Sequence, residues 1–112
     1  MTFYIKEGDT SPAIEHQLQD DEGNSVDITG FQEVEFHFKK ENVDEVKVNE
    51  NTSGGVEVTD AAQGKVQYNW SEGDTDETGD HEAEWEVTFA DGTVETFPNR
   101  RNIDISVEEQ IA

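Results

Sequence analysis

Apolar residues alternate with charged or polar ones along most of this chain, and this spacing limits its fold more than any other feature. Val34, Phe36 and Phe38, for example, are separated by acidic and basic residues. Side chains of a β-strand point alternately to two faces, so a period of two predicts strands with one buried face. Strands are expected at 3–5, 13–18, 33–39, 46–48, 56–58, 65–70, 82–89, 94–97 and 103–107. A short helical turn is expected near 107–111.

Turn residues separate these segments, and Asp91-Gly92 between two of them is typical of a tight hairpin. Eight or nine short strands with regular turns predict an all-β fold, a β-sandwich first and a small barrel second. Trp70 and Trp85 are in phase with the apolar residues of their strands, so both are expected in the core. With 112 residues and no linker, residues 1–112 are expected to form one domain.

The charge of the chain is extreme, with 28 acidic residues against 7 basic ones, for a net charge of -21. Low hydrophobicity with high charge is typical of disorder, but the regular apolar pattern argues against it here. Such a surface repels nucleic acids and anionic membranes, so neither is an expected partner. No apolar run is long enough for a membrane span, and Met1–Gly8 lacks the features of a signal peptide. We therefore expect a water-soluble protein.

The acidic residues also repel one another, which destabilises a compact state in ordinary salt. At about 1 M salt the Debye length falls to roughly 3 Å, and most of this repulsion disappears. The acids are spread along the whole chain, and only five lysines are present. This distribution favours a protein from a salt-saturated habitat over the alternatives, a DNA mimic or a cation buffer.

No catalytic or metal-binding motif is present in the sequence. The chain has no cysteine, and His16, His37 and His81 lack the spacing of metal ligands on one strand. His37 falls on the charged face of its strand and is expected to be solvated, whereas His16 and His81 are in phase with apolar residues and are expected at the edge of the core. Nucleophile and phosphate-loop motifs are missing as well. We expect no enzyme activity, no catalytic residue, no metal and no cofactor.

Two acidic segments, Asp20–Asp27 and Asp74–Asp80, superficially resemble calcium loops. Counted from Asp20, glycine falls at the fourth position and Phe31 at the twelfth, where an EF-hand has glycine at the sixth and glutamate at the twelfth. The first segment is therefore expected to be a hairpin turn, and the second has the same status.

The arginines provide the candidate interaction site, because the chain has just two and they are adjacent. Arginine is enriched in protein interfaces. The candidate interface residues are Arg100, Arg101, Phe97, Pro98, Asp9 and Thr10, with the core as the alternative location of Phe97. The alternative is that both arginines fold back onto Glu95 or Asp104, where exposed ion pairs contribute little.

The order of these motifs resembles the N-terminal domain of the phage baseplate upper protein family, over about Phe3 to Val107. The segments that carry the resemblance are Gly8–Pro12, Asp21–Gly30, Val34–Phe38, Gly64–Trp70, Gly73–Thr75 and Gly79–Pro98. The resemblance implies an immunoglobulin-like β-sandwich that docks onto other virion proteins.

On this resemblance we expect a non-enzymatic structural protein of a tailed virus with a haloarchaeal host, an adapter at the baseplate or tail. It would be assembled in the host cytoplasm, in several copies per symmetric virion. Baseplate upper proteins continue into a helical trimerising stalk that has no counterpart in residues 1–112, so decoration or fibre attachment at the head or neck is an alternative. The other alternative is a carbohydrate- or calcium-binding module for adhesion to the host surface, with Tyr4 and Phe31 as exposed aromatic candidates.

Overall fold

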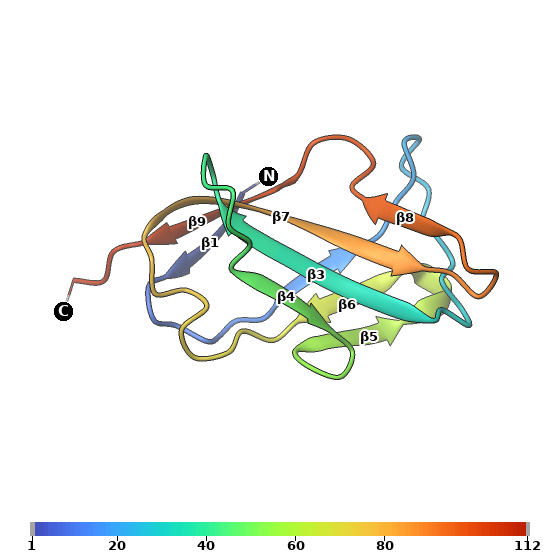
Figure 1. Ribbon diagram of the computed structural model, residues 1–112, viewed down its shortest axis with the longest axis horizontal. Coiled ribbons are helices and arrows are strands. Elements are labelled where there is room, and N and C mark those ends of the chain that lie inside the picture. Colours follow the sequence, from blue (N-terminus) through green and yellow to red (C-terminus); the bar gives the residue numbers. More distant parts are fainter. Residues whose placement is uncertain (1, 112) are drawn as a thin grey trace.

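A computed structural model describes residues 2–111, which form nine β-strands and one short 3-10 turn (Figure 1). The elements are β1 (Thr2–Lys6), β2 (Ile14–Gln17), β3 (Glu33–Lys40), β4 (Val48–Asn51), β5 (Val56–Asp60), η1 (Ala61–Gln63), β6 (Lys65–Tyr68), β7 (Gly79–Thr88), β8 (Val94–Phe97) and β9 (Ile103–Glu108). The number of strands predicted from the sequence is therefore confirmed.

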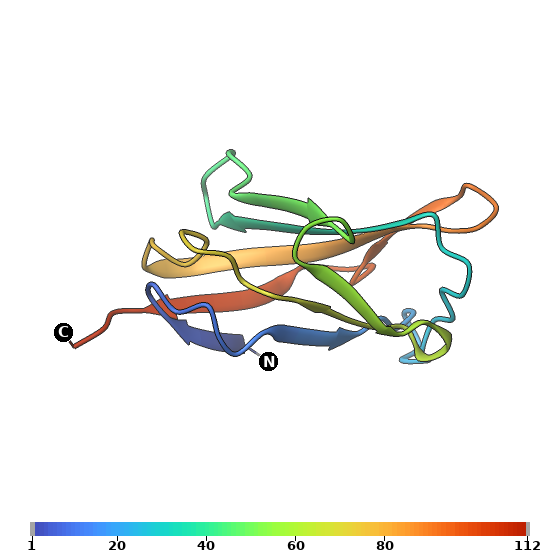
Figure 2. The same ribbon diagram turned by 90° about the horizontal axis from the view of Figure 1, so that it is seen from below.

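The strands form two sheets that face each other, as Figure 2 shows from the side. The larger sheet has the order β1-β9-β7-β3-β4, with β8 also paired to β7, and the smaller has the order β2-β6-β5. β1 runs parallel to β9, whereas the other paired strands are antiparallel. β8 and β9 follow one another along the same side of β7, so residues 98–102 interrupt what would otherwise be one long strand.

This pairing is that of an immunoglobulin-like β-sandwich that includes a C′ strand. β2, β6 and β5 take the places of strands B, E and D, and β4, β3, β7 and β9 those of C′, C, F and G. The two sheets are not joined by a ladder within the described residues, which excludes the small barrel. The predicted sandwich is confirmed.

Aromatic side chains fill the space between the sheets. Trp70 and Trp85 are 5% and 0% exposed, so the prediction that both point into the core is confirmed. The ring of Phe36 lies 4.6 Å from that of Tyr68 and 4.8 Å from that of Trp85, which joins the smaller sheet to the larger one. Tyr68 is itself buried and donates its hydroxyl hydrogen to Asp74 at 2.7 Å.

Two details of the sequence prediction are wrong. The strand expected at 46–48 begins at Val48, and Val46 is 50% exposed in the loop before it, because the ladder with Phe38 starts only at Val48. The helical turn expected near 107–111 is also absent from the described residues. Pairing of Val107 with Ile5 and of Glu108 with Lys6 holds this segment extended.

The Asp91-Gly92 turn joins β7 to β8 as predicted. The Phe89 amide donates to the Thr93 carbonyl at 2.8 Å, and the Asp91 carboxylate accepts the Thr93 amide at 3.0 Å. Gly92 has a φ of 89°, a backbone conformation that glycine adopts at no steric cost.

Candidate interaction surface

The loop at residues 98–102 leaves the edge of the sandwich between β8 and β9 (Figure 1). Pro98 at its start is half-buried, whereas Arg100 and Arg101 are exposed. Pro98 and Arg100 line a hollow that they share with His16 of β2 in the opposite sheet and with Asp20 of the turn after β2. The start of the loop therefore lies beside β2 and the turn that follows it.

Neither guanidinium group forms a salt bridge or donates a hydrogen bond to any residue of 2–111. Glu95, one of the two carboxylates expected to bind them, instead accepts a hydrogen bond from the Asn99 side chain at 2.9 Å. The fold-back alternative is therefore not what the structure contains. Three of the five lysines, in contrast, do form salt bridges.

Arg101 also has an unusual backbone, with a φ of 61° in the left-handed region. This region costs a residue with a side chain roughly 1–2 kcal/mol, because Cβ approaches the following carbonyl oxygen. Such strain persists only where the surroundings impose it, and it is frequent at functional sites.

The prediction that Phe97 is an interface residue is wrong. Its side chain is completely buried, because it pairs with Trp85 across β8 and β7 and faces the core. Phe97 anchors the loop rather than contacting a partner.

Asp9 and Thr10 do not lie with the arginines. They follow β1, where the Asp9 carbonyl accepts the Thr75 hydroxyl at 2.8 Å and the Asp9 carboxylate accepts the Gln110 side chain at 3.2 Å. Thr75 is buried. This loop is thus held against the segment before β7, away from the 98–102 loop (Figure 1).

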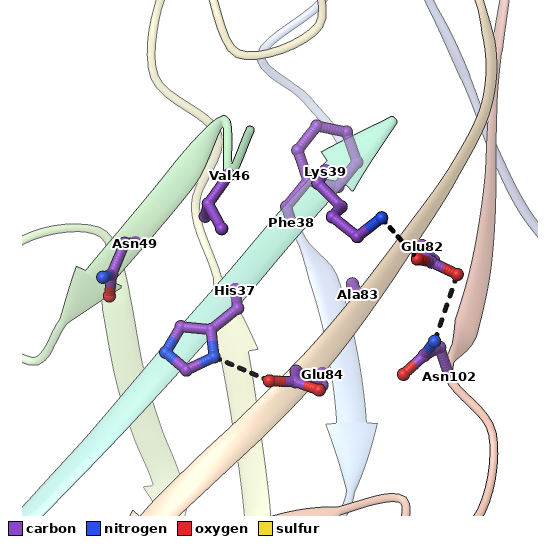
Figure 3. Close-up of a pocket in the computed structure, with 9 residues that line it drawn as sticks. All are labelled: His37, Phe38, Lys39, Val46, Asn49, Glu82, Ala83, Glu84 and Asn102. Atoms are coloured by element: carbon purple, nitrogen blue, oxygen red, sulfur yellow. Dashed lines mark hydrogen bonds and ion pairs between the residues drawn. The ribbon is translucent and has the colours of Figure 1, made fainter. Parts of the chain in front are cut away.

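A second hollow lies on the outer face of the larger sheet, with a volume of about 240 Å³ (Figure 3). We call it the outer hollow. Its lining residues come from β3, β4, β7 and the loops beside them: His37, Phe38, Lys39, Val46, Asn49, Glu82, Ala83, Glu84 and Asn102. Asn102, the last residue of the 98–102 loop, makes the loop and the outer hollow neighbours.

His37 stands between two carboxylates in the outer hollow. Its Nδ1 lies 2.9 Å from Glu84 on β7, and its Nε2 lies 3.3 Å from Glu35 on its own strand. The side chain is 20% exposed, so the expectation of a solvated histidine is wrong. Partial burial lowers the pKa of His37, but the hydrogen bonds and charges of Glu84 and Glu35 outweigh it and raise the pKa above its ordinary value.

We expect His37→Gln to destabilise the protein more at about pH 5.5 than at about pH 8.5, by about 0.2–1 kcal/mol. A pKa raised by folding means that the folded state holds the proton more tightly. That stability is complete below the pKa of the unfolded chain, and it is lost as the pH rises through the folded pKa. Urea unfolding of both proteins at constant salt measures the difference.

His16→Gln is the matched control, because burial lowers the pKa of His16 and no carboxylate contacts it among the described residues. A lowered pKa gives stability that is present above the unfolded pKa and lost as the pH falls through the folded pKa. The two substitutions should therefore change stability with opposite dependence on pH. A pH-independent effect of His37→Gln would contradict the ion-pair assignment.

The other two histidines lie where the sequence placed them. His16 is half-buried at the edge of the core, and His81 is buried with its ring 4.7 Å from that of Phe38. The Nδ1 of His81 lies 3.0 Å from the Gly79 carbonyl, and burial lowers its pKa. Both are therefore held as neutral packing groups.

The first acidic segment is the hairpin turn that the sequence predicted. Gln19 pairs with Ser25, and the Asp20 carboxylate accepts the amides of Asn24 and Glu22 at 3.0 and 2.9 Å. These hydrogen bonds hold the pKa of Asp20 below its usual range. Within residues 2–111, no three histidine or acidic side chains converge as a metal site would require.

The exposed aromatic candidates differ from each other. Tyr4 is 65% exposed on β1, but Phe31 packs against the core and is not an exposed residue.

No family model matches this chain, and no curated protein matches it in sequence. Among solved structures, murine CRIg is similar at 13% sequence identity, over 98% of this chain and 91% of the CRIg chain, with a TM-score of 0.39. No helix among residues 2–111 is long and apolar enough to cross a membrane. The fold assignment rests on the strand pairing described above.

Proposed function

We propose that this chain is a non-enzymatic structural protein of a tailed-virus particle, an adapter that docks onto other virion proteins at the baseplate or tail. The order of its motifs, which resembles that of baseplate upper proteins, supports this class of function. The composition supports a particle that works in concentrated salt, as expected for a haloarchaeal host. Attachment at the head or neck is the alternative within the same class.

The observation that carries the proposal is the exposed arginine pair, which has no salt-bridge partner among residues 2–111, on a chain of net charge -21. Other proteins of the same habitat are acidic too, so two such surfaces meet only where salt screens them or a local cation matches a carboxylate. Arginine suits this role, because its planar fork binds a carboxylate through two parallel hydrogen bonds. The left-handed backbone of Arg101 is consistent with a residue kept for contact rather than for stability.

The direct test is to purify particles from an infected culture and locate this chain in them. Peptide mass spectrometry should detect it as an abundant component, and electron cryomicroscopy should place its copies at symmetric positions with the 98–102 loop against a neighbouring protein. Its absence from purified particles would contradict the proposal.

Incorporation of variants tests the arginine pair itself. Arg100→Ser with Arg101→Ser should leave the chain folded and reduce its incorporation into particles by about tenfold, the result of losing roughly 1.4 kcal/mol of binding. The matched control is Lys6→Ser with Lys65→Ser, which removes the same charge from two lysines that form no salt bridge with the described residues. Normal incorporation of the arginine variant would show that the interface lies elsewhere.

A further inference from the structure

We propose that the 98–102 loop of one copy of this chain binds the outer hollow of a second copy. The inference rests on the proposed function, because it specifies how neighbouring copies of the adapter contact each other. The loop and the outer hollow adjoin each other, because Arg101 directly precedes Asn102. The Asn102 side chain lines the outer hollow and donates a hydrogen bond to Glu82 at 3.1 Å.

The outer hollow has the groups that a guanidinium requires. Glu82 and Glu84 lie on its rim, and each contacts one side chain of β3, the Lys39 ammonium at 2.9 Å and the His37 imidazole at 2.9 Å (Figure 3). A carboxylate has about four lone-pair sites, so both keep acceptor capacity for a further donor. Val46, across β3 from the two carboxylates, adds apolar surface to the outer hollow, against which the aliphatic part of an arginine can pack (Figure 3).

The loop has the matching groups, and within residues 2–111 these groups form no ion pair. Neither Arg100 nor Arg101 forms a salt bridge with Glu82, Glu84 or another carboxylate of residues 2–111. In the proposed contact, a second copy supplies those carboxylates.

The position of the two parts favours a two-fold arrangement. Because the loop and the outer hollow are adjacent on one molecule, a two-fold axis beside Asn102 places each loop against the hollow of the other copy. The same contact then forms twice, as in the closed, self-complementary dimers that are the commonest oligomers.

Salt decides whether the copies can meet. Two chains of net charge -21 repel each other strongly in dilute buffer. At about 1 M salt the screening length of roughly 3 Å removes this long-range repulsion. Charge-assisted hydrogen bonds are about 2.8 Å long, which is shorter than the screening length, so salt weakens them much less. Association should therefore strengthen as salt rises, unlike that of oppositely charged partners.

Analytical ultracentrifugation of the full chain tests the inference, at about 1 M and 3 M sodium chloride and at about 10 μM to 1 mM protein. We expect a reversible monomer–dimer equilibrium that Arg100→Ser with Arg101→Ser weakens at least about tenfold, equivalent to ~1.4 kcal/mol. Lys6→Ser with Lys65→Ser should leave it unchanged. A wild-type chain that is folded and monomeric throughout would overturn the inference, as would equal weakening by the two double variants.

A charge exchange identifies the two surfaces as partners. Arg100→Glu with Arg101→Glu should be monomeric, and so should a chain with Glu82→Lys and Glu84→Lys, but an equal mixture should form a heterodimer in which both contacts are attractive. Circular dichroism checks that each chain is folded. If the lysine variant unfolds beside Lys39, Glu84→Gln replaces it and should weaken the wild-type dimer. Folded chains that fail to associate on mixing, or a Glu84→Gln dimer of unchanged affinity, would exclude the outer hollow.

The two proposals fail separately. A monomeric chain located in purified particles would remove the dimer and keep the adapter. A dimer with the predicted charge dependence, formed by a chain that particles lack, would remove the adapter and keep the dimer.

Discussion

Transferred from concentrated salt to dilute buffer, the chain is expected to lose its β-structure in one cooperative step. Its net charge of -21 is confined to 112 residues, and at about 0.01 M salt the Debye length of roughly 30 Å exceeds most distances inside so small a domain. Every carboxylate then repels most of the others, which favours the expanded chain. Circular dichroism across a salt series should show the native spectrum restored by about 1 M salt.

The structure locates part of this repulsion on the outer face of the larger sheet. Glu35 on β3 lies directly opposite Glu86 on β7, and like charges in this position destabilise an antiparallel pair. Lys39 neutralises Glu82 on the same two strands, but Glu86 has no cationic partner among the described residues. The larger sheet should therefore be the part that depends most on salt.

A matched pair of variants tests this location. Glu86→Gln removes a carboxylate that faces another one, and it should lower the salt concentration needed for folding. Glu57→Gln removes the same charge from β5, where the residue opposite is the neutral Gln67, and it should have a smaller effect. An unchanged melting temperature of the wild-type chain in dilute buffer would contradict the whole account.

The strands could be predicted well because the alternation of apolar and polar residues within each strand shows which of its faces is buried. Alternation along β3 and β7 requires one face to be buried, and the burial of Phe36 and Trp85 follows from that phase alone. The tight turn at Asp91-Gly92 is equally local, since its residue types determine its backbone.

The candidate site was only partly predictable, because it depends on which strands are neighbours. His37 was expected in solvent, and its contact with Glu84 exists only because the register of β3 and β7 sets these residues opposite each other. The outer hollow was not predicted at all, since it also needs Val46 from a loop and Asn102 from another. The sequence contained one indication that His37 has a carboxylate neighbour, because Glu35 lies on the same face of the same strand.

Phe97 shows the opposite error, in which a nearby functional signal misled the interpretation. It was grouped with the arginines by its position next to them in the chain, although the register of β8 on β7 places it opposite Trp85. Backbone geometry separates the two roles within a few residues: the strand ends with Phe97 buried, and the loop then carries Arg100 and Arg101 outward.

Trp85→Ala should cost roughly 3–5 kcal/mol of unfolding free energy, the largest effect expected of a single substitution in this chain. Trp85 is fully buried in the central strand of the larger sheet, where its ring contacts Phe36 at 4.8 Å and its backbone pairs with Phe36 and Phe97. Its indole N–H has no acceptor among the described residues, so its contribution comes from packing rather than from a hydrogen bond. Alanine would leave a cavity that β3 and β8, held by their ladders to β7, cannot fill.

Urea unfolding in salt that maintains the native state measures this loss. Circular dichroism is the signal, because it does not require the tryptophan that the substitution removes. Tyr4→Ala is the control, because it removes a large aromatic side chain that is 65% exposed, and it should change stability by no more than about 0.5 kcal/mol. Because small domains have a total stability of about 5–15 kcal/mol, Trp85→Ala is expected to leave the chain marginally folded even in concentrated salt. A cost below about 1 kcal/mol would mean that Trp85 does not fill the space between the two sheets. The assignment of which β7 side chains face the core would then be wrong.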